Sequence, residues 1–504
     1  MKTLLWCLAA LAALVPGISA TPGHRWLADN KLDLYQSCLG TNRPVTADLF
    51  FTPTSSAYLD FATGTNARID RHPAAVFFAQ NEHDVVVALE CALLVGLTPV
   101  ARSGGHSYET LSSIDGGVVI DLASMNNVTV ISRNDTAQTG VASVQGGARL
   151  GQVYKEIYRQ GGYNFNAGTC PGVGIGGHIS GGGYGMVSRH YGMAADSTVG
   201  LRVALYNGTV VEATATENSD LFWALRGGGS GSFGIVTEFR IQLHKVPQST
   251  MFVIYYDNTV TSQLIRAWMD YFPTADSRIT TQVNVDKDGT TFRGQFIGPM
   301  WELNELLDAS GMLSHGGIKY DVRTDKCTSL GTKAFMWGDN CNNLDVLNTE
   351  VHPRSNSKSY SKMKSAYASK KLPDDGIRLV IDQVNKAPAS SWIQFEAFGG
   401  KFATQPLSYT PWGGRDAVFS VQLYIAGNKG DPASSPNRNW IRDFATALQP
   451  YMNGRSYQNY CDLEIGPNYG EVYWGKDNFQ RLKQVKARYD PQNIFHNEQS
   501  VPLP

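Results

Sequence analysis

The chain carries little charge, and neither sign is in excess. Only 17% of its 504 residues are charged, and 43 basic and 44 acidic side chains give a formal net charge of -1. Proteins that bind nucleic acid or anionic membranes normally present a basic face. The composition shows no such footprint, so we expect a partner that is neither nucleic acid nor a membrane.

Long hydrophobic runs are missing after the first 20 residues. Residues 1–20 contain a lysine, a short apolar run and then small residues up to Ala20, which is the pattern of a secretory signal peptide. The run is too short to span a membrane. Asn-x-Thr sequons at Asn127, Asn134 and Asn207 agree with export. We therefore expect a secreted, extracellular glycoprotein that is cleaved near Ala20.

Spacings typical of structural zinc sites are absent too. No C-x-x-C or H-x-x-x-H occurs, so we expect no metal site. In an oxidising compartment most of the cysteines should instead pair. Removal of the signal peptide, which contains Cys7, leaves Cys38, Cys91, Cys170, Cys327, Cys341 and Cys461.

Two disulfides are expected from the order of these cysteines. Cys327 and Cys341 close a short loop, and Cys38 with Cys91 is the next pair that we predict. The two cysteines that remain either join each other or leave Cys170 free for chemistry.

Glycine, by contrast, is abundant, and in the first half of the chain it is clustered. The clusters lie between strand-like and helix-like segments, at residues 104–105, 146–147, 172–185 and 227–234. Glycine lets a backbone approach a ligand closely and lets N–H groups point at anions. Clusters that recur in this way indicate a large phosphate-bearing cofactor held by backbone.

The densest glycine stretch, residues 165–185, contains a match to G-x-G-x-x-G at 172–177. A dinucleotide-binding turn of the nicotinamide type should follow a strand and open a helix within a βαβ unit. No clear βαβ unit frames this match, which makes a nicotinamide site the weaker interpretation. A flexible linker fits less well still, because Val173, Ile175 and Ile179 are apolar.

The expected elements change in character near residue 247. Before it, glycine-rich turns separate short helices and strands; after it, glycine is sparser and alternating strands occur among helical stretches. The second part therefore predicts a sheet with helices on one face. The expected elements are helices at 82–96, 148–162 and 477–491, a hairpin at 197–213, and strands at 97–101, 116–122, 142–147, 235–246, 279–285, 391–398 and 418–426.

Two motifs identify the chain as similar to a known family. Arg102-Ser-Gly-Gly-His-Ser-Tyr108, followed by Gly168-Thr-Cys-Pro-Gly-Val-Gly-Ile-Gly-Gly-His178, resembles the berberine-bridge-enzyme-like flavoprotein oxidases of the vanillyl-alcohol-oxidase superfamily. The nearest branch looks like the secreted fungal gluco-, chito- and xylo-oligosaccharide oxidases. The resemblance covers nearly the whole mature chain and continues through 220–229, 234–239 and 459–495.

That resemblance implies a fold and a domain order. The fold is α+β, of the two-domain vanillyl-alcohol-oxidase type. An FAD-binding domain of two α/β subdomains joins a substrate domain with a large antiparallel sheet backed by helices. The implied boundaries are 1–20 for the signal peptide, 21–246 for a PCMH-type FAD-binding domain (core about 68–246), 247–455 for the substrate domain, and 456–504 for a segment that returns to the FAD domain.

The resemblance also implies FAD attached by two covalent bonds. His106 would bond the 8α-methyl carbon as a neutral imidazole, and Cys170 would bond C6 as a readily formed thiolate, which a site rich in N–H donors favours. Without the second motif, His106 would be interpreted as an ordinary loop histidine; His178 is assigned only packing or hydrogen bonding. The other residues expected around FAD are Ser103, Gly104, Gly105, Ser107, Thr169, Val173, Gly174, Gly177, Gly181, Gly182, Gly234 and Ile235.

Val173 has a narrower meaning in the family. The residue at this place is thought to control the access of oxygen to the flavin, with valine in oxidases and leucine in dehydrogenases. The resemblance therefore implies hydrogen peroxide as a product. A β-branched packing residue is the alternative, and both roles can hold.

A second set of residues suits a sugar substrate. Trp392, Gln394 and Glu396 alternate on one strand and share a face, which combines a stacking ring, an amide and a carboxylate. The alternative is a half-exposed sheet face without a ligand. The other expected substrate contacts are Gln422, Tyr424 and Asn284.

Tyr460, Glu396 and Tyr108 are the expected catalytic residues. By resemblance, Tyr460 would take the proton of the anomeric hydroxyl while C1 passes a hydride to flavin N5, and the lactone would hydrolyse to an aldonic acid. Free tyrosine, with a pKa of about 10, is a poor base, so Glu396 would accept its proton. Tyr108 would line the cavity. Similar enzymes carry Asp in place of Glu396 and Glu or Gln in place of Asn284, and Cys461 has no assigned role.

These observations give three hypotheses. The first is a secreted, monomeric FAD-dependent oxidase that oxidises the anomeric C1 hydroxyl of oligosaccharides and reduces O2 to H2O2. The second is an oxidase of the same fold acting on an alkaloid, a phenolic alcohol or another secondary metabolite. Only the 392–396 strand and Tyr424 distinguish the first hypothesis from the second. The third is a flavin-binding or sugar-binding protein with little turnover.

Overall fold

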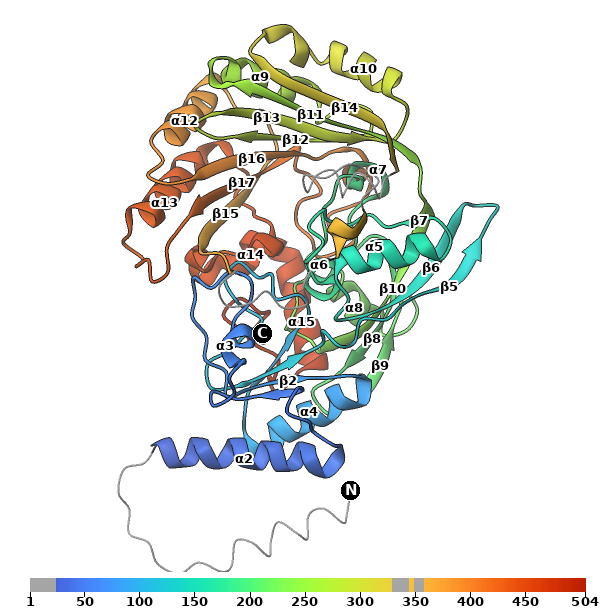
Figure 1. Ribbon diagram of the computed structural model, residues 1–504, viewed down its shortest axis with the longest axis vertical. Coiled ribbons are helices and arrows are strands. Elements are labelled where there is room, and N and C mark those ends of the chain that lie inside the picture. The colour runs from blue at the N-terminus through green and yellow to red at the C-terminus, as the bar shows by residue number, and fades with distance from the viewer. Residues whose placement is uncertain (1–23, 329–343, 349–357) are drawn as a thin grey trace, which may run out of the picture.

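Three β-sheets organise the chain, which folds as an α+β protein (Figure 1). The computed structural model describes residues 24–328, 344–348 and 358–504. A four-stranded and a six-stranded sheet lie in the N-terminal part, and a seven-stranded sheet begins at residue 248. The α+β arrangement expected from the sequence is confirmed.

The first sheet has the strand order β1-β2-β4-β3, and β4 runs parallel to both of its neighbours. Helix α4 (Glu82–Val95) connects β2 to β3. It begins at Asn81, whose side chain accepts a hydrogen bond from the Asp84 N–H, and ends at Gly96 in the left-handed conformation (φ 68°). The sequence predicted α4, β3 and β4. The strands are β1 (Phe50–Phe51), β2 (Ala75–Phe78), β3 (Pro99–Arg102) and β4 (Val118–Asp121).

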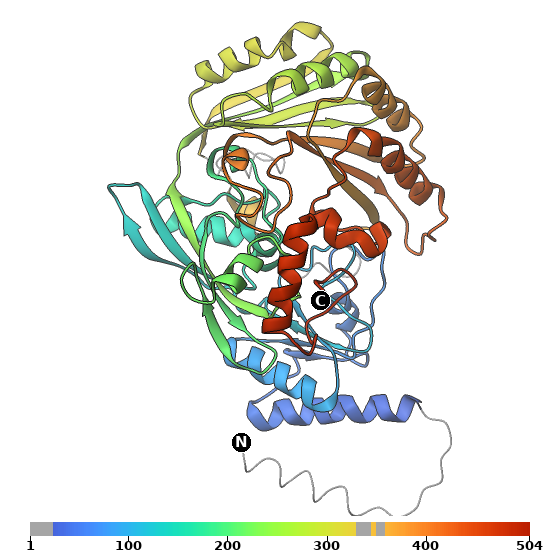
Figure 2. The ribbon, with the colours of Figure 1, turned by 180° about the vertical axis from the view of Figure 1, so that it is seen from behind.

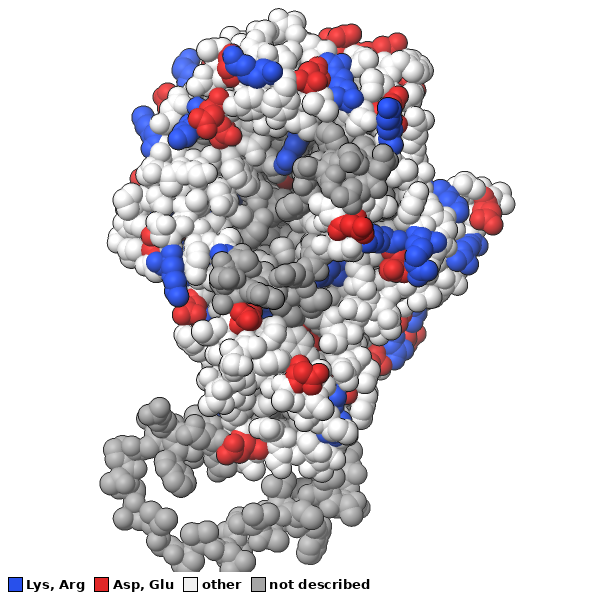
Figure 3. Space-filling model, viewed as in Figure 1, with Lys and Arg blue, Asp and Glu red and all other residues white. Residues whose placement is uncertain are grey.

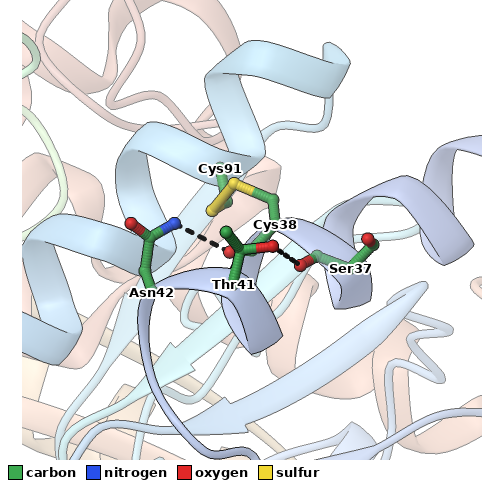
Figure 4. Close-up of a disulfide and its surroundings, with 5 residues drawn as sticks. All are labelled: Ser37, Cys38, Thr41, Asn42 and Cys91. Atoms are coloured by element: carbon green, nitrogen blue, oxygen red, sulfur yellow. Dashed lines mark hydrogen bonds between the residues drawn. A yellow bond between two sulfur atoms is a disulfide. The ribbon is translucent and has the colours of Figure 1, made fainter. Parts of the chain in front are cut away.

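A disulfide ties the N-terminal helix to helix α4 (Figure 4). Helix α2 (His24–Asn42) packs along α4, and Cys38 is bonded to Cys91 with the Cα atoms 5.7 Å apart. The expected Cys38–Cys91 pair is therefore confirmed. Cys327 is also disulfide-bonded, whereas its expected partner Cys341 lies outside the described residues.

The second sheet has the order β5-β6-β10-β8-β9, with β7 paired to β10. Every second residue of β10 from Ile235 to Leu243 is buried, and Phe239, Ile241 and Leu243 share a core with the apolar side chains of α5 (Leu150–Arg159). The expected helix at 148–162, the hairpin at 197–213 and the strand at 235–246 are confirmed. The strands are β5 (Val128–Asn134), β6 (Thr139–Gln145), β7 (Tyr163–Asn164), β8 (Thr198–Ala204), β9 (Val210–Ala213) and β10 (Ile235–Lys245).

The third sheet is antiparallel throughout, in the order β14-β11-β13-β12-β16-β17-β15. Its strands are β11 (Gln248–Asp257), β12 (Ile279–Val285), β13 (Gly289–Phe296), β14 (Ile318–Thr328), β15 (Ser361–Ala368), β16 (Ser391–Ala397) and β17 (Phe419–Ala426). The helices on its outer face are α9 (Thr261–Tyr271), α10 (Met300–Ala309), α12 (Asp374–Asn385) and α13 (Pro436–Leu448).

The two faces of this sheet differ in chemistry. Phe292 and Phe395 point to the helices and form an apolar core with Trp268. Because successive residues of a strand point to opposite faces, Arg293 and Glu396 point away from the helices. The polar face of the sheet is therefore turned toward the N-terminal part of the chain.

The C-terminal segment returns to the N-terminal part (Figure 2). Helices α14 (Tyr469–Trp474) and α15 (Lys476–Tyr489) add apolar side chains to its core. Just before them, Asp462 pairs with the buried Lys362 of β15 (2.5 Å), which also pairs with Glu109. This buried ion cluster joins the three parts of the chain that surround the site.

The surface agrees with the near-neutral composition. On the face shown in Figure 3, basic and acidic side chains of the described residues are interspersed. No helix within the described ranges is long and apolar enough to cross a bilayer.

Candidate active site

A cavity of about 780 Å³ lies between the glycine-rich loops and the polar face of the seven-stranded sheet. Small-molecule sites typically measure roughly 300–1,000 Å³. Across the described part of the chain, no group of three or more His, Cys, Asp or Glu is placed to hold a metal ion. The expected cofactor residues that line the cavity are Ser103, Gly104, Gly105, His106, Ser107, Thr169, Cys170, Val173, Gly174, Gly177, Gly234 and Ile235.

Two glycine loops form one wall of the cavity by direct backbone contact. A Cβ atom on Gly104 would lie 2.2 Å from the Gly174 nitrogen, and one on Gly174 would lie 2.2 Å from the Gly104 nitrogen. Ser103 Oγ donates to Gly146 O (2.6 Å) and accepts from the Gly176 N–H (3.3 Å). Only glycine fits at this crossing, which explains why it recurs in both loops.

His106 and Cys170 lie on these neighbouring loops. A Cβ atom on Gly172 would be 3.0 Å from His106 Nε2, so the imidazole lies beside the chain two residues after Cys170. Burial, and then the charge of Arg149, lower the pKa of His106 to about 4. The imidazole is therefore neutral at physiological pH, as a nucleophilic role requires.

The Cys170 thiol is not disulfide-bonded and opens to the cavity. Its depth in the molecule raises its pKa by desolvation, while the charge of Arg293 and a hydrogen bond with Thr169 act in the opposite direction. Desolvation thus outweighs the nearby cation, so the pKa of the thiol is raised and not lowered as the sequence led us to expect.

On the sheet side of the cavity, Tyr460 and Glu396 form a hydrogen-bonded pair. Tyr460 Oη donates to Glu396 Oε1 over 3.0 Å. The carboxylate also accepts from Gln394 Nε2 (3.0 Å), Gln282 Nε2 (3.4 Å) and Ser420 Oγ (2.5 Å). Gln282 and Ser420 lie directly across from Glu396 on the two neighbouring strands, so strand register assembles this cluster.

Burial dominates the electrostatics of this pair. It raises the pKa of Glu396, while hydrogen bonds to the carboxylate and the charge of Arg293 act in the opposite direction. Burial also raises the pKa of Tyr460 well above its ordinary value, and the charge of Glu396 raises it further. Burial thus favours a neutral phenol that donates its hydrogen bond to Glu396.

Arg293 and Gln282 line the cavity beside this pair, although the sequence did not single them out. Arg293 Nε donates to Gln282 Oε1 (3.0 Å), and its Nη2 donates to Gln394 Oε1 (3.1 Å). The guanidinium therefore holds both amides that bind Glu396. The sequence offered only a weak signal for Arg293, which is the one charged residue in the strand GTTFRGQF.

Tyr108 packs against the Tyr460–Glu396 pair from the loop side. Its ring lies on that of Tyr460, with centroids 5.7 Å apart and planes at 14°. Gln422 Nε2 donates to the Tyr108 hydroxyl over 2.9 Å. All three residues line the cavity, so a residue of the loops and residues of the sheet meet at one point.

Two glycines expected at the cofactor do not line the cavity. A Cβ atom on Gly181 would meet Asn459 Oδ1 at 2.0 Å. Gly182, with φ 121°, packs against Trp412. Both glycines serve the packing behind the wall.

Two expected substrate residues also lie outside the wall. Asn284 is two residues along β12 from Gln282, which lines the cavity instead. Tyr424 stacks on Trp392, with centroids 5.0 Å apart and planes at 5°, and Trp392 is the member of this pair that reaches the cavity.

His178 and Cys461 line the cavity without an expected chemical role. His178 Nε2 accepts from the Gly168 N–H (3.0 Å), and burial lowers its pKa to about 4, which agrees with the hydrogen-bonding role. Cys461 Sγ lies 3.5 Å from Ser107 Oγ, and burial raises its pKa. Cys461 and Cys170 are both free thiols, so they are not joined to each other.

Comparisons with known proteins agree with these features. Residues 73–214, which contain His106 and Cys170, match the FAD binding domain family, and residues 456–502, which contain Tyr460, match the berberine and berberine-like family. The chain is 31% identical to the chitooligosaccharide oxidase of Gibberella zeae over 97% of each chain. It is 30% identical to the glucooligosaccharide oxidase of Sarocladium strictum over 90% of this chain and 92% of that one.

A solved structure shows the same fold. The structure of BBE-like 1 from Physcomitrella patens matches with a TM-score of 0.84 at 28% identity, covering 93% of this chain and 99% of that chain. The fold is therefore the two-domain vanillyl-alcohol-oxidase type that the motifs implied. The chain belongs to the family of berberine-bridge-enzyme-like FAD-linked oxidoreductases.

Proposed function

We propose that this protein is a secreted flavoprotein oxidase that oxidises the anomeric C1 hydroxyl of oligosaccharides to lactones and reduces O2 to H2O2. The proposal rests on the Tyr460–Glu396 hydrogen bond in the wall of the cavity that His106 and Cys170 share. A hydroxyl carbon gives up a hydride only as the hydroxyl proton is removed, and this pair can accept that proton. The two oligosaccharide oxidases among the relatives support a sugar substrate.

The cavity suits FAD, the cofactor of the family. A Cβ atom on Gly177 would meet nothing within 4 Å, so glycine here leaves open space in the wall. Gln458 Oε1 and Tyr184 Oη are buried, belong to cavity-lining residues, and have no hydrogen-bond partner within the described chain. A ring system with polar edges would satisfy such atoms. FAD supplies a hydride acceptor that passes electrons on to O2.

His106 and Cys170 are the residues that we propose to hold FAD covalently, at its 8α-methyl carbon and at C6. The low pKa of His106 supports its role as a neutral nucleophile. Cys170 must lose its proton, and Arg293 is the cation that favours the thiolate. Val173, which lines the same wall, is proposed to leave O2 a path to the flavin.

Tyr460 is proposed to take the C1 hydroxyl proton and to pass its own proton to Glu396. Because its pKa is raised, Tyr460 holds no phenolate in advance, so the two transfers are coupled. Ser420 and Arg293 help to keep the carboxylate ionised between turnovers. Although Glu396 is one methylene longer than the aspartate of similar enzymes, it still reaches the phenol at 3.0 Å.

The reducing-end sugar is proposed to lie between Tyr108 and the strand face. Trp392 offers an aromatic ring for stacking, and Gln394 and Gln422 offer amides to the sugar hydroxyls. This arrangement joins an apolar face with a few fixed polar groups, as small-molecule sites commonly do.

Export is part of the proposal. It is supported by the signal-like residues 1–20 and by the three sequons, whose Asn127, Asn134 and Asn207 are all exposed. A surface position is what N-glycosylation requires.

A peroxide assay on a substrate panel tests the function. The panel holds cello-, xylo-, malto- and chitooligosaccharides, lactose, and phenolic alcohols. We expect at least one saccharide to give H2O2 and the aldonic acid in equal amounts. Turnover of phenolic alcohols alone would favour the second hypothesis over this function, and bound flavin without any turnover would favour a binding protein.

A further inference from the structure

We infer that the strand face beyond Trp392 carries a second, distal sugar-binding surface, formed by Tyr255, Tyr320, Asn284 and Thr291 (the distal surface). The inference rests on the proposed function and deepens it: the preferred substrates are saccharide chains long enough to reach from the catalytic pair to Tyr255.

One cross-strand row connects the distal surface to the catalytic strand. Tyr320 pairs with Tyr255, and Tyr255 pairs with Thr291. Thr291 pairs with Asn284, and Asn284 pairs with Gln394. Residues directly opposite each other on antiparallel strands share a face. Because Gln394 lines the cavity, this row leads from the cavity to β14. Strand β14 is an edge of the sheet (Figure 1).

The aromatic side chains of this row are open to solvent. Tyr320 is 49% exposed, and Tyr255, Thr291 and Asn284 are partly exposed. By contrast, the neighbouring Tyr256 points to the helices, is buried, and donates to a backbone carbonyl in the core. The two tyrosines of the distal surface are therefore not part of the core packing.

Two stacked aromatic pairs stand on this face of the sheet. Tyr255 and Tyr320 have ring centroids 5.5 Å apart and planes at 16°, and Trp392 and Tyr424 have centroids 5.0 Å apart and planes at 5°. Each pair joins adjacent strands about 4.8 Å apart, so the rings stand on edge on the sheet. The free faces of Tyr255 and Trp392 therefore border the strip of β13 and β12 between them, and Trp392 lies two residues further along the sheet than Tyr255.

The groups between the two aromatic pairs are polar and short. Asn284 and Thr291 offer an amide and a hydroxyl to the sugar hydroxyls, while the C–H faces of a pyranose suit the rings. Burial, and then the charges of Asp286 and Asp288, raise the pKa of Tyr255, so carboxylates also lie near this end. Aromatic walls with a polar floor match a chain of linked sugar rings.

The length of the row selects for long substrates. Tyr255 lies three strands across the sheet and two residues along it from Glu396, a path on the order of 16 Å. A disaccharide whose reducing end lies at Glu396 is too short to cover this path, whereas a chain of about four rings covers it.

A second copy of the chain is the competing occupant, because β14 is an edge strand. Lys319, Asp321 and Arg323 alternate with Tyr320 and Val322 along this strand. Charged side chains on an edge strand oppose pairing with another strand. The structure thus favours a saccharide over a second copy.

Steady-state kinetics on a disaccharide and a hexasaccharide of the same linkage test the inference. The variants are Tyr255→Ala, Tyr320→Ala and Tyr320→Phe in the holoenzyme. Trp301→Ala is the matched control, since Trp301 is 62% exposed but lies on α10, which covers the opposite face. We expect both tyrosine-to-alanine variants to lower kcat/KM for the hexasaccharide about five-fold, through KM. The disaccharide should be unaffected, and Tyr320→Phe and Trp301→Ala should behave as wild type.

Other outcomes separate this inference from the proposed function. Equal losses on both substrates, or no preference of the wild type for the longer chain, would overturn the inference while the oxidase function stands. A wild-type dimer that Tyr320→Ala dissociates would assign the surface to a second copy. If no saccharide is oxidised, the proposed function fails. Calorimetric binding of the hexasaccharide then decides: binding weakened by Tyr255→Ala supports the distal surface, and absence of binding overturns it.

Discussion

The glycine loops and the strand face line one cavity, but the loops contribute mainly backbone atoms and the strand face contributes side chains. In the loops, backbone atoms of Gly104 and Gly174 touch, and Ser103 ties the crossing to the next turn. On the strand face, side chains from three strands and the C-terminal segment converge on Glu396. The loops define the space for a large ligand, and the strand face defines where a proton can go.

This difference implies that substitutions in the two regions have different effects. A side chain added in the loops occupies space that the cofactor needs, so binding and turnover are lost together. A side chain altered on the strand face removes one group, so turnover is lost while the cofactor stays. Substitutions in each region should therefore separate cofactor binding from catalysis.

The largest effect is expected from Gly177→Val. The added side chain extends from a helix position into open space at the cavity, so it competes with FAD without striking the protein. We expect a folded protein that holds no flavin and has no measurable activity, as judged by circular dichroism and by visible absorbance. Gly40→Val is the control, because Gly40 is also helical and unobstructed but lies on α2. A normally yellow Gly177→Val would contradict the placement of the cofactor.

Tyr460→Phe should retain FAD and lose turnover. Removing the phenol removes the group that we propose to take the substrate proton, and general-base catalysis is typically worth about 10²–10⁴-fold. We expect a loss of this size in kcat, with an unchanged flavin spectrum. Tyr424→Phe, which keeps a ring outside the cavity wall, should leave kcat unchanged. A Tyr460→Phe variant within a few-fold of wild type would remove this residue from the mechanism.

Glu396→Gln tests the pH dependence of the strand face. In the proposed mechanism only the ionised carboxylate can accept the proton. Burial raises its pKa, so activity should be full above that pKa and fall as pH drops through it. The acid limb of the wild-type kcat profile should therefore lie above the ordinary pKa of glutamate. The amide variant should lose about 10²-fold in kcat and lose the acid limb. An acid limb that persists in Glu396→Gln would assign it to another group.

Cys170→Ala is expected to have the smallest effect on turnover. His106 and the backbone contacts remain, so we expect activity within about an order of magnitude of wild type. The flavin should still be retained after acid precipitation, whereas the double variant with His106→Ala should release it. Release of flavin from the single variant would show that His106 forms no bond.

The contrast between the glycine loops and the strand face also explains which features could be predicted from the sequence. Helix α4 was predictable because its apolar periodicity and its glycine stop are local signals. That His106 and Cys170 would line one cavity was predictable because the loops that carry them are motifs. Asn284 and Gln282 share one face of β12, so the strand pattern fits either at the site. Only the pairing of β12 with β16, which lies far along the chain, sets Gln282 opposite Glu396.

Arg293 and the pKa of Cys170 show the same limit. The strand that carries Arg293 has no motif, and the arginine reaches the site through the order of strands in the sheet. The motif indicated a reactive thiol at Cys170, but its pKa depends on desolvation by the surrounding protein and on Arg293, which folding brings to the same cavity. Both properties arise from packing between segments that are distant in sequence.

Anaerobic flavin reduction by an oligosaccharide labelled with deuterium at C1 tests the central claim most directly. The Tyr460–Glu396 pair is proposed to act on the anomeric centre, so C–H cleavage at C1 should limit the bleaching of the flavin absorbance. We predict that deuterium at C1 slows this bleaching several-fold, and that deuterium at C6 leaves its rate unchanged. A bleaching rate that is unchanged by deuterium at C1, or the absence of bleaching with every oligosaccharide tested, would contradict the account.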